Sequence, residues 1–287
     1  MKEKLLTYEE AVRWMRSQPD MAESVTFSYL DADNLAAAKR FLESEEFSEV
    51  IKLLRLNRAN TKLKILDIGC GNGIASYAFA SRGYEVYAVD PDPSKDVGTG
   101  AIKRLSAEIG NGSISIVQAF AEALPFADST FDIVYARQAL HHFSDLRKGI
   151  GECSRVLKAG GLFLATREHV ISDEQQLNAF LKHHILHKLH GGENAYCLEA
   201  YISALQEANL KILKCLGHFD TVINHFPAPV SNSEVRNWLS HALEKKIGER
   251  LANLLIKIPI IENYYRNRLS RHCDIPGRLY SFLCVKK

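Results

Sequence analysis

The chain has 287 residues, long enough for one large α/β domain or a domain with a cap, and its composition is ordinary for a globular protein. A net charge of +2 gives no general attraction to nucleic acid, and no apolar run reaches the ~20 residues that a membrane span needs. Acids stand near the start where a secretory signal has an apolar core, and the six cysteines contain no C-x-x-C pair, so we expect a cytoplasmic protein with reduced thiols.

Helices are expected before the first core strand. Capping side chains begin three of them: Thr7 with Glu10, then Asp33 or Asn34, then Ser44. About sixty residues thus form a helical segment that precedes the sheet. The stretch between the first two helices is expected to be non-helical, and its aromatic residues are candidates either to touch a ligand or simply to pack: Phe27 and Tyr29.

The stretch from Leu63 to Ala80 reads LKILDIGCGNGIASYAFA and organises the prediction. Lys64 to Ile68 is a short apolar run typical of a buried parallel strand, with Asp67 near its carboxyl end. Glycines follow at positions 69, 71 and 73, and the apolar spacing then becomes helical. A strand, a glycine turn and a helix N-terminus together predict a ligand site in an open α/β sheet.

Charge near this turn indicates which ligand binds. A pyrophosphate loop would read G-x-G-x-x-G and would gain nothing from a carboxylate, whereas here the spacing is G-x-G-x-G and Asp67 precedes it. A second apolar strand, Tyr84 to Val89, ends in Asp90, whose carboxylate can accept from both ribose hydroxyls. The two acids favour S-adenosylmethionine (SAM) over NAD, and an NAD oxidoreductase is the least favoured interpretation.

Four motifs resemble, in order, those of class I SAM-dependent methyltransferases: LDIGCGNG, VYAVDPDP, AEALPFADSTFDIVYARQALHHF and RVLKAGGLFLATRE. The chain resembles most the broad branch that includes the ubiquinone/menaquinone C-methyltransferases, over about Lys62 to Arg167. The resemblance implies an α/β fold with a Rossmann-like, seven-stranded, mostly parallel sheet, an antiparallel last strand and helices on both faces. It also implies SAM as cofactor and S-adenosyl-L-homocysteine as product.

The same resemblance supplies the candidate cofactor residues. Many relatives carry an aspartate just before the AEALPF segment to accept from the adenine amino group, and Phe120 stands there instead, so we expect its ring to line or stack on the adenine. Arg137 follows the fourth strand and points to the methionine carboxylate or to the substrate. The full set is Asp67, Gly69, Cys70, Gly71, Asp90, Pro91, Phe120, Ala121, Glu122 and Arg137.

The remaining pattern sets the domain organisation. Further strands are expected at residues 114–118, 131–135, 162–166, 211–216 and 279–285. Roughly sixty residues separate the last two, far more than an ordinary loop. We expect a helical N-terminal cap at 1–60, a SAM-binding α/β core at 61–220, a helical insertion at 221–277 that serves as a lid or a dimer surface, and a final core strand at 278–287.

Catalytic candidates lie where the fifth strand ends. Methyl transfer to oxygen needs alignment and a base near pH 7, which favours histidine. His169 is the first choice, and His141 and His142 come second. Arg167 and Glu168 complete the catalytic candidates: Arg137 and Arg167 either hold carboxylate or phosphate groups or form salt bridges with acids such as Glu168 or Glu193.

A metal is not expected, because no fixed zinc signature is present. The alternatives are the histidines at 183, 187 and 190 on one helix face, or His169 with Glu193. No N-P-P-Y-like segment follows the fourth strand, which counts against DNA-base methylation. The favoured function is SAM-dependent methylation of a small, anionic metabolite, on oxygen before carbon or nitrogen. The alternatives are a protein or RNA methyltransferase, with the basic insertion as docking surface, and a SAM-binding accessory protein that does not catalyse.

Overall fold

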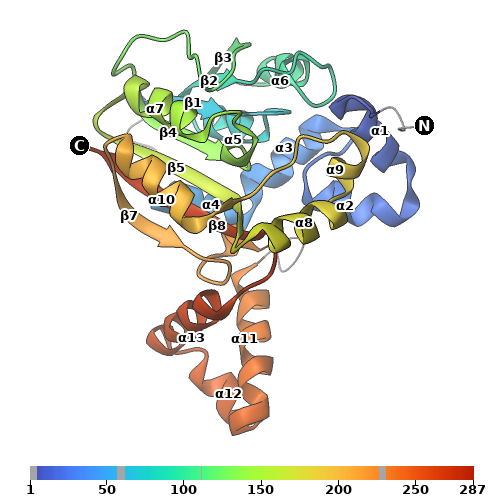
Figure 1. Ribbon diagram of the computed structural model, residues 1–287, viewed down its shortest axis with the longest axis vertical. Coiled ribbons are helices and arrows are strands. Elements are labelled where there is room, and N and C mark those ends of the chain that lie inside the picture. The colour runs from blue at the N-terminus through green and yellow to red at the C-terminus, as the bar shows by residue number, and fades with distance from the viewer. Residues whose placement is uncertain (1–4, 57–61, 111, 226–230) are drawn as a thin grey trace.

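The computed structural model describes residues 5–56, 62–110, 112–225 and 231–287, and its centre is one twisted sheet (Figure 1). The strands run in the order β3-β2-β1-β4-β5-β8-β7, and the short strand β6 pairs with the end of β5. Their bounds are β1 Lys64–Ile68, β2 Glu85–Val89, β3 Ser113–Val117, β4 Phe131–Arg137, β5 Leu157–Ile171, β6 Tyr196–Cys197, β7 Leu210–Leu216 and β8 Arg278–Lys286.

This sheet confirms the predicted fold. Strands β3, β2, β1, β4 and β5 are parallel to their neighbours, whereas β8 lies antiparallel between β5 and β7. The order reverses between β1 and β4, so the carboxyl ends of these two strands form the crevice in which open α/β sheets bind ligands.

Helices cover both faces of the sheet. Alternate strand residues point to opposite faces, so that Ile65 packs with α3, α4 and α5 while Leu66 packs with α7 and α10. The helices outside the insertion are α1 Tyr8–Ser17, α2 Ala22–Phe27, α3 Asn34–Glu43, α4 Glu45–Leu53, α5 Ile74–Ser81, α6 Thr99–Ser106, α7 Leu146–Val156, α8 Glu174–His183, α9 Ile185–Leu189 and α10 Leu198–Glu207. Three short 3₁₀ turns are η1 Pro19–Met21, η2 Leu140–His142 and η3 Val222–Asn224.

The N-terminal helices begin at predicted caps. Thr7 and Glu10 form the capping box of α1, and the side chains of Asp33 and Ser44 accept from backbone N–H groups at the starts of α3 and α4. One expectation is wrong: Phe27 is the last residue of α2 rather than part of a non-helical stretch. Tyr29 follows it in the left-handed region, at φ 56°.

Two predicted helices are interrupted. The histidine-rich helix is capped by Asp173 and stops at His184, where the backbone is extended, so His183 belongs to α8 and His187 to α9. The long helix of the insertion also breaks, because Gly248 adopts φ 80° between α11 (Asn232–Ile247) and α12 (Glu249–Leu255). Helix α13 (Pro259–His272) then returns to β8, and the three helices project away from the sheet (Figure 1).

The insertion has a small core of its own, formed by Val235, Leu239, Leu243, Ala252 and Ile256. Across the four described ranges, none of the helices combines the length and the apolar character needed to cross a membrane.

Candidate active site

The glycine turn leaves one open face. A Cβ at Gly69 would lie 2.6 Å from the Ala139 Cβ, and one at Gly73 would lie 2.7 Å from Ile102 Cγ1, so both residues are small because the chain packs closely there. A Cβ at Gly71 would meet only the Val97 carbonyl oxygen, at 3.7 Å. All three have positive φ, which favours glycine. The space over Gly71 is therefore where a ligand can approach the backbone.

Asp90 stands beside that open face. Its carboxylate accepts hydrogen bonds from the backbone N–H of Gly71, at 2.8 Å, and from the backbone N–H of Asp92, at 2.9 Å. Burial raises the pKa of Asp90, while these two backbone bonds lower it. Because the donors fix the carboxylate in place, its remaining lone pairs are oriented before any ligand arrives.

Asp67 lies deeper, at 1 % exposure, and accepts a hydrogen bond from the Ser76 hydroxyl at 2.5 Å. Burial raises the pKa of Asp67 to about 7, and the nearby Asp90 adds to that shift. A cation bound next to the two acids would offset their repulsion, in line with the predicted preference for a positively charged ligand.

The segment predicted to meet an adenine is partly exposed. Phe120 is 64 % exposed, whereas Ala121 is buried. Glu122 accepts from the backbone N–H of Asp145, at 3.1 Å. The buried Cys70 donates its backbone N–H to Val89 and so holds the glycine turn against β2. Pro91 accepts a hydrogen bond from Gln118 on the far side of Asp90. Cofactor contacts by these residues stay predictions.

Arg137 and Arg167 share a partner that the sequence did not indicate. Glu46 on α4 binds Arg137 with both carboxylate oxygens, at 2.7 and 3.1 Å, and lies 3.4 Å from Arg167. Arg167 also donates to the carbonyl oxygens of Ile223 and His225. Although burial acts against it, the two guanidinium groups hold the pKa of Glu46 below its usual value. The salt bridges therefore run to Glu46 rather than to Glu168 or Glu193.

A cavity of about 720 Å³ opens beside this group of charges. Residues of α2, α3 and α4 line it together with Arg167, Val222 and His225. Tyr29 also lines it, and the Tyr29 carbonyl oxygen accepts from the Asn72 side chain of the glycine turn, at 2.7 Å. A single hydrogen bond, from Asn72 to Tyr29, thus joins the glycine turn to the wall of the cavity.

Glu168 points to the opposite face of β5. It is fully buried and accepts backbone N–H bonds from Ala139, Leu140 and His141, at 3.1 to 3.2 Å. It also contacts His141 Nδ1 at 2.7 Å. Glu168 therefore fixes η2 and the orientation of one imidazole. A direct role for it in catalysis stays a prediction.

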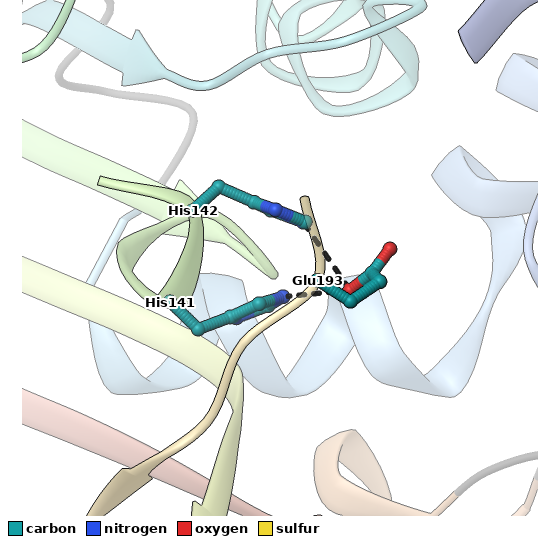
Figure 2. Close-up of side chains that lie close together, drawn as sticks. All are labelled: His141, His142 and Glu193. Carbon is teal, nitrogen blue, oxygen red and sulfur yellow. Dashed lines mark ion pairs between the residues drawn. The ribbon is translucent and has the colours of Figure 1, made fainter. Parts of the chain in front are cut away.

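A cluster of histidines surrounds η2. His141 and His142 both turn their Nε2 atoms toward the Glu193 carboxylate, at 3.9 and 3.8 Å (Figure 2). His169 Nδ1 contacts the Gly277 carbonyl oxygen at 2.9 Å, and its ring packs on the His141 ring. Burial lowers the pKa of His141 and of His169 well below the usual value. Nothing in these contacts tests a general-base role, so the role of His169 in catalysis stays a prediction.

Helix α1 closes over the crevice. The backbone N–H of Leu6 donates to Leu189, and Glu9 accepts from the backbone N–H of Asp96, six residues after Asp90. Burial raises the pKa of Tyr8, and the charges of Glu193 and Asp90 raise it further. The start of the chain is thus attached both to α9 and to the segment that follows Asp90.

The chain matches known proteins in this region. Residues 66–165 match the family model described as a methyltransferase domain. The chain contains a class I SAM-dependent methyltransferase domain. A relative named as an uncharacterized methyltransferase, YcgJ of Bacillus subtilis, is 36 % identical over 145 residues, which are 50 % of this chain and 54 % of that protein. A ubiquinone biosynthesis O-methyltransferase of Rhizobium johnstonii is 31 % identical over 134 residues, 47 % of this chain and 52 % of the relative.

Solved structures support the fold of the methyltransferase domain. The crystal structure of YcgJ from Bacillus subtilis has a TM-score of 0.55 at 22 % identity and covers 84 % of this chain and 98 % of its own. A geranyl diphosphate methyltransferase in complex with SAM also has a TM-score of 0.55, at 14 % identity, with 96 % and 95 % coverage. By sequence, however, the chain spans only about half the length of the curated relatives it matches.

The methyltransferase family implies SAM as cofactor, and the residues present fit it. The open backbone at Gly71 is a cradle that any Cβ would narrow, and Asp90 is oriented beside it. Sequence reasoning missed Glu46, because a glutamate near the start of a helix is usually a surface residue. It also did not pair Glu193 with His141 and His142, which lie about fifty residues away in the sequence.

Proposed function

We propose that the protein transfers a methyl group from SAM to an oxygen of a small, anionic metabolite. The observation that carries the proposal is the Asp90 carboxylate, held by two backbone N–H groups beside the open face of Gly71. The ubiquinone biosynthesis O-methyltransferases among the relatives favour oxygen as the acceptor atom.

The residues of the chain would have the following roles in methyl transfer. SAM supplies a methyl group on a sulfonium centre that is displaced in line by the acceptor. Asp90 would bind the ribose hydroxyls, and the backbone at Gly71 would approach the cofactor closely. Ala121 and Phe120 would border the adenine. Helix α1, which Glu9 and Leu6 attach over the crevice, would exclude water from the reacting groups.

The acceptor site is proposed to be the cavity beside Arg167. Its charged wall residues are the basic Lys39, Arg40 and Arg167 and the acidic Glu43, Glu45 and Glu46, and the basic ones would bind a carboxylate or phosphate group on the acceptor. A volume of about 720 Å³ suits a metabolite. A cavity of this size supports a small molecule as the acceptor over a folded protein or an RNA.

Cofactor binding tests the first half of the proposal. Calorimetric titration with SAM, S-adenosylhomocysteine and NADH in parallel should give micromolar binding of the first two and no response to the third. The Asp90→Asn variant should bind SAM more weakly, whereas Asp128→Asn, an exposed aspartate paired with Arg155, should match the wild type. NADH binding without SAM binding would contradict the proposal.

The acceptor is found with SAM labelled on its methyl group. Incubation with fractionated cell extract should place the label in a small-molecule fraction, with a mass increase of one methylene. Label in protein or RNA would instead support the alternative acceptors. Once the acceptor is known, Phe27→Ala in the cavity wall should change its KM, and Trp14→Ala on α1 outside the cavity should not.

For the insertion at residues 221–277 we propose a homodimer surface rather than a lid. Its three helices carry a set of exposed apolar side chains: Trp238, Leu251, Leu254, Ile258, Ile260 and Tyr264. Association with a second copy of the chain would remove such side chains from water, which favours a dimer through this insertion. Light scattering after gel filtration should give twice the chain mass, and Ile260→Glu with Leu254→Glu should give the monomer. A monomeric wild type would contradict this assignment.

A further inference from the structure

Three potential metal-ligand atoms meet where η2 approaches Glu193. His141 Nε2, His142 Nε2 and a Glu193 carboxylate oxygen all lie within 4.8 Å of one another (Figure 2). In a tetrahedral site with bonds of about 2.1 Å, neighbouring ligand atoms are about 3.4 Å apart. The two histidine–glutamate distances of 3.9 and 3.8 Å exceed that separation by only a few tenths of an ångström. Small rotations of the side chains would bring the three atoms to bonding distance.

The tautomers of both histidines suit a metal. His142 Nδ1 faces the Gly192 carbonyl oxygen at 3.3 Å, and a carbonyl can only accept, so that nitrogen carries the proton. The Glu168 carboxylate already accepts three backbone N–H bonds and can only accept from His141 Nδ1, at 2.7 Å, so that nitrogen carries the proton and donates a fourth bond. Each Nε2 is therefore left with its lone pair.

Two lone pairs facing a carboxylate repel it. A divalent cation between the three groups would convert this repulsion into coordination. The Glu168–His141 contact is moreover the carboxylate–histidine arrangement that orients metal ligands in proteins.

A fourth donor stands next to the group. His184, in the break between α8 and α9, has its Nδ1 atom 3.8 Å from the second Glu193 oxygen. That atom is buried and finds no hydrogen-bond partner among the residues that the structure describes. The His184 Nδ1 atom can bind the ion as a fourth ligand. Without it, the ion keeps an open position, as in catalytic metal sites with three protein ligands.

We propose that His141, His142 and Glu193 bind a divalent transition-metal ion, with Glu168 as the outer partner of His141 and His184 as an additional donor. Two imidazoles and one carboxylate select zinc, iron, cobalt or nickel over magnesium and calcium, which prefer oxygen ligands. This assignment departs from the sequence expectation of no metal and from the alternative on the helix face at 183, 187 and 190.

The site lies beside the proposed cofactor crevice, since η2 begins after Ala139, which packs against Gly69 of the glycine turn. The proposed acceptor cavity lies on the other face of β5, so the metal ion is not assigned a role in activating the acceptor. Metal binding therefore does not rest on the proposed function.

Metal binding is tested on the full chain without a histidine tag, after removal of metal with a chelator. Titration with Co²⁺, followed by visible absorption, and with Zn²⁺, followed by calorimetry and elemental analysis, should give one equivalent per chain. Glu193→Gln and His142→Asn should each weaken the affinity at least tenfold, and Glu168→Gln should weaken it about 10–100-fold through its effect on His141. His183→Asn, an exposed histidine of α8, is the matched control and should bind as the wild type does.

Because His142 is 45 % exposed, its replacement is the variant expected to fold best, and circular dichroism of each metal-free variant verifies the fold. Absence of stoichiometric Zn²⁺ and Co²⁺ binding would overturn the proposal, as would binding that persists in both Glu193→Gln and His142→Asn or is lost in His183→Asn. SAM titrations of the same metal-free samples are separate: SAM binding without metal binding refutes the metal site alone, and the converse refutes the proposed function alone.

Discussion

Glu46→Gln should be the most destabilising conservative substitution on the N-terminal helices. The Glu46 carboxylate is buried, binds Arg137 through two nitrogens and lies 3.4 Å from Arg167. Glutamine keeps the shape and one acceptor oxygen, but it leaves two buried guanidinium groups without their shared negative charge. Breaking a buried ion pair on one side costs about 3–5 kcal/mol. We expect a loss near the lower end, about 3 kcal/mol, because the amide oxygen still accepts a hydrogen bond.

The pH dependence identifies the charge as the cause. The pKa of Glu46 is below its usual value, because the two guanidinium groups outweigh the effect of burial. A depressed carboxylate contributes stability that is present above its unfolded-state pKa of about 4.3 and is lost as pH falls through the folded-state pKa. The difference between wild type and Glu46→Gln should therefore be constant near pH 7 and shrink below about pH 4.

Urea unfolding followed by circular dichroism measures both effects. Glu49→Gln, at a partly exposed glutamate of the same helix paired with Lys52, is the control and should change stability by less than about 0.5 kcal/mol. Adding Arg167→Met to Glu46→Gln removes one of the two cations that Glu46 neutralises and should restore about 1–2 kcal/mol. A Glu46→Gln loss below about 1 kcal/mol, or one that does not depend on pH, would refute the reasoning.

Three further predictions concern the ligand crevice. Asp90→Ala should weaken SAM binding at least tenfold in calorimetry, because a charge-assisted hydrogen bond to ribose contributes about 1.5–3 kcal/mol, and unchanged affinity would remove Asp90 from that role. Burial raises the pKa of Asp67 to about 7, so the wild type loses stability as the pH rises and this buried carboxyl ionises. Between pH 5 and pH 8 the stability of Asp67→Asn should therefore rise by about 2 kcal/mol relative to that of the wild type. A stability difference between the two proteins that does not vary with pH would contradict this. Gly69→Ala should cost about 1–3 kcal/mol through contact with Ala139 and positive φ, whereas Gly151→Ala on α7, where a Cβ meets nothing, should be neutral or stabilising in the same unfolding assay.

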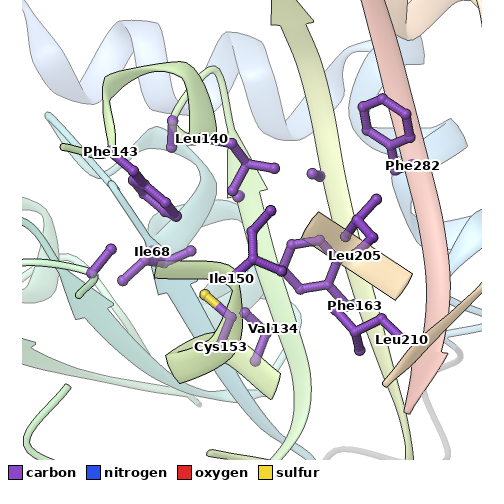
Figure 3. Packing of buried hydrophobic residues seen from close by; sticks show 14 of the residues in the cluster. Ile68, Val134, Leu140, Phe143, Ile150, Cys153, Phe163, Leu205, Leu210 and Phe282 are labelled. Atoms are coloured by element: carbon purple, nitrogen blue, oxygen red, sulfur yellow. The ribbon is translucent and has the colours of Figure 1, made fainter. Parts of the chain in front are cut away.

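The sheet and the glycine turn were predictable because their signals are local. Buried parallel strands read as short apolar runs, and alternation along them assigns Val134 and Phe163 to the face covered by α7, where they meet Ile150 and Cys153 (Figure 3). The caps at Thr7 and Ser44 were equally local, because one side chain and one nearby N–H group decide them.

Helix breaks and long-range pairs were not predictable in the same way. The sequence placed His183 and His187 on one helix, but the extended backbone at His184 separates them, and no glycine or proline marks that position. Glu46 and Arg137 are 91 residues apart, and nothing in either local pattern selects the other. Glu168 and Glu193 were expected as arginine partners because they lie closer to the arginines in the sequence. The packing of α4 against the sheet instead brings Glu46 next to Arg137 and Arg167.

The run Arg167–Glu168–His169 shows why three ionisable residues at a strand end do not form one catalytic group. Strand β5 changes its register against β8 between Ala165 and Glu168, and Arg167 has φ 61° in that bulge. Successive side chains of a strand point to opposite faces, so Arg167 meets Glu46 beside the cavity, while Glu168 meets η2 and His141 on the other side. The same bulge therefore positions the wall of the proposed acceptor cavity and the outer partner of the proposed metal site. A substitution that alters the cavity wall should therefore also alter the metal site, and the reverse, because both depend on the backbone of two adjacent residues.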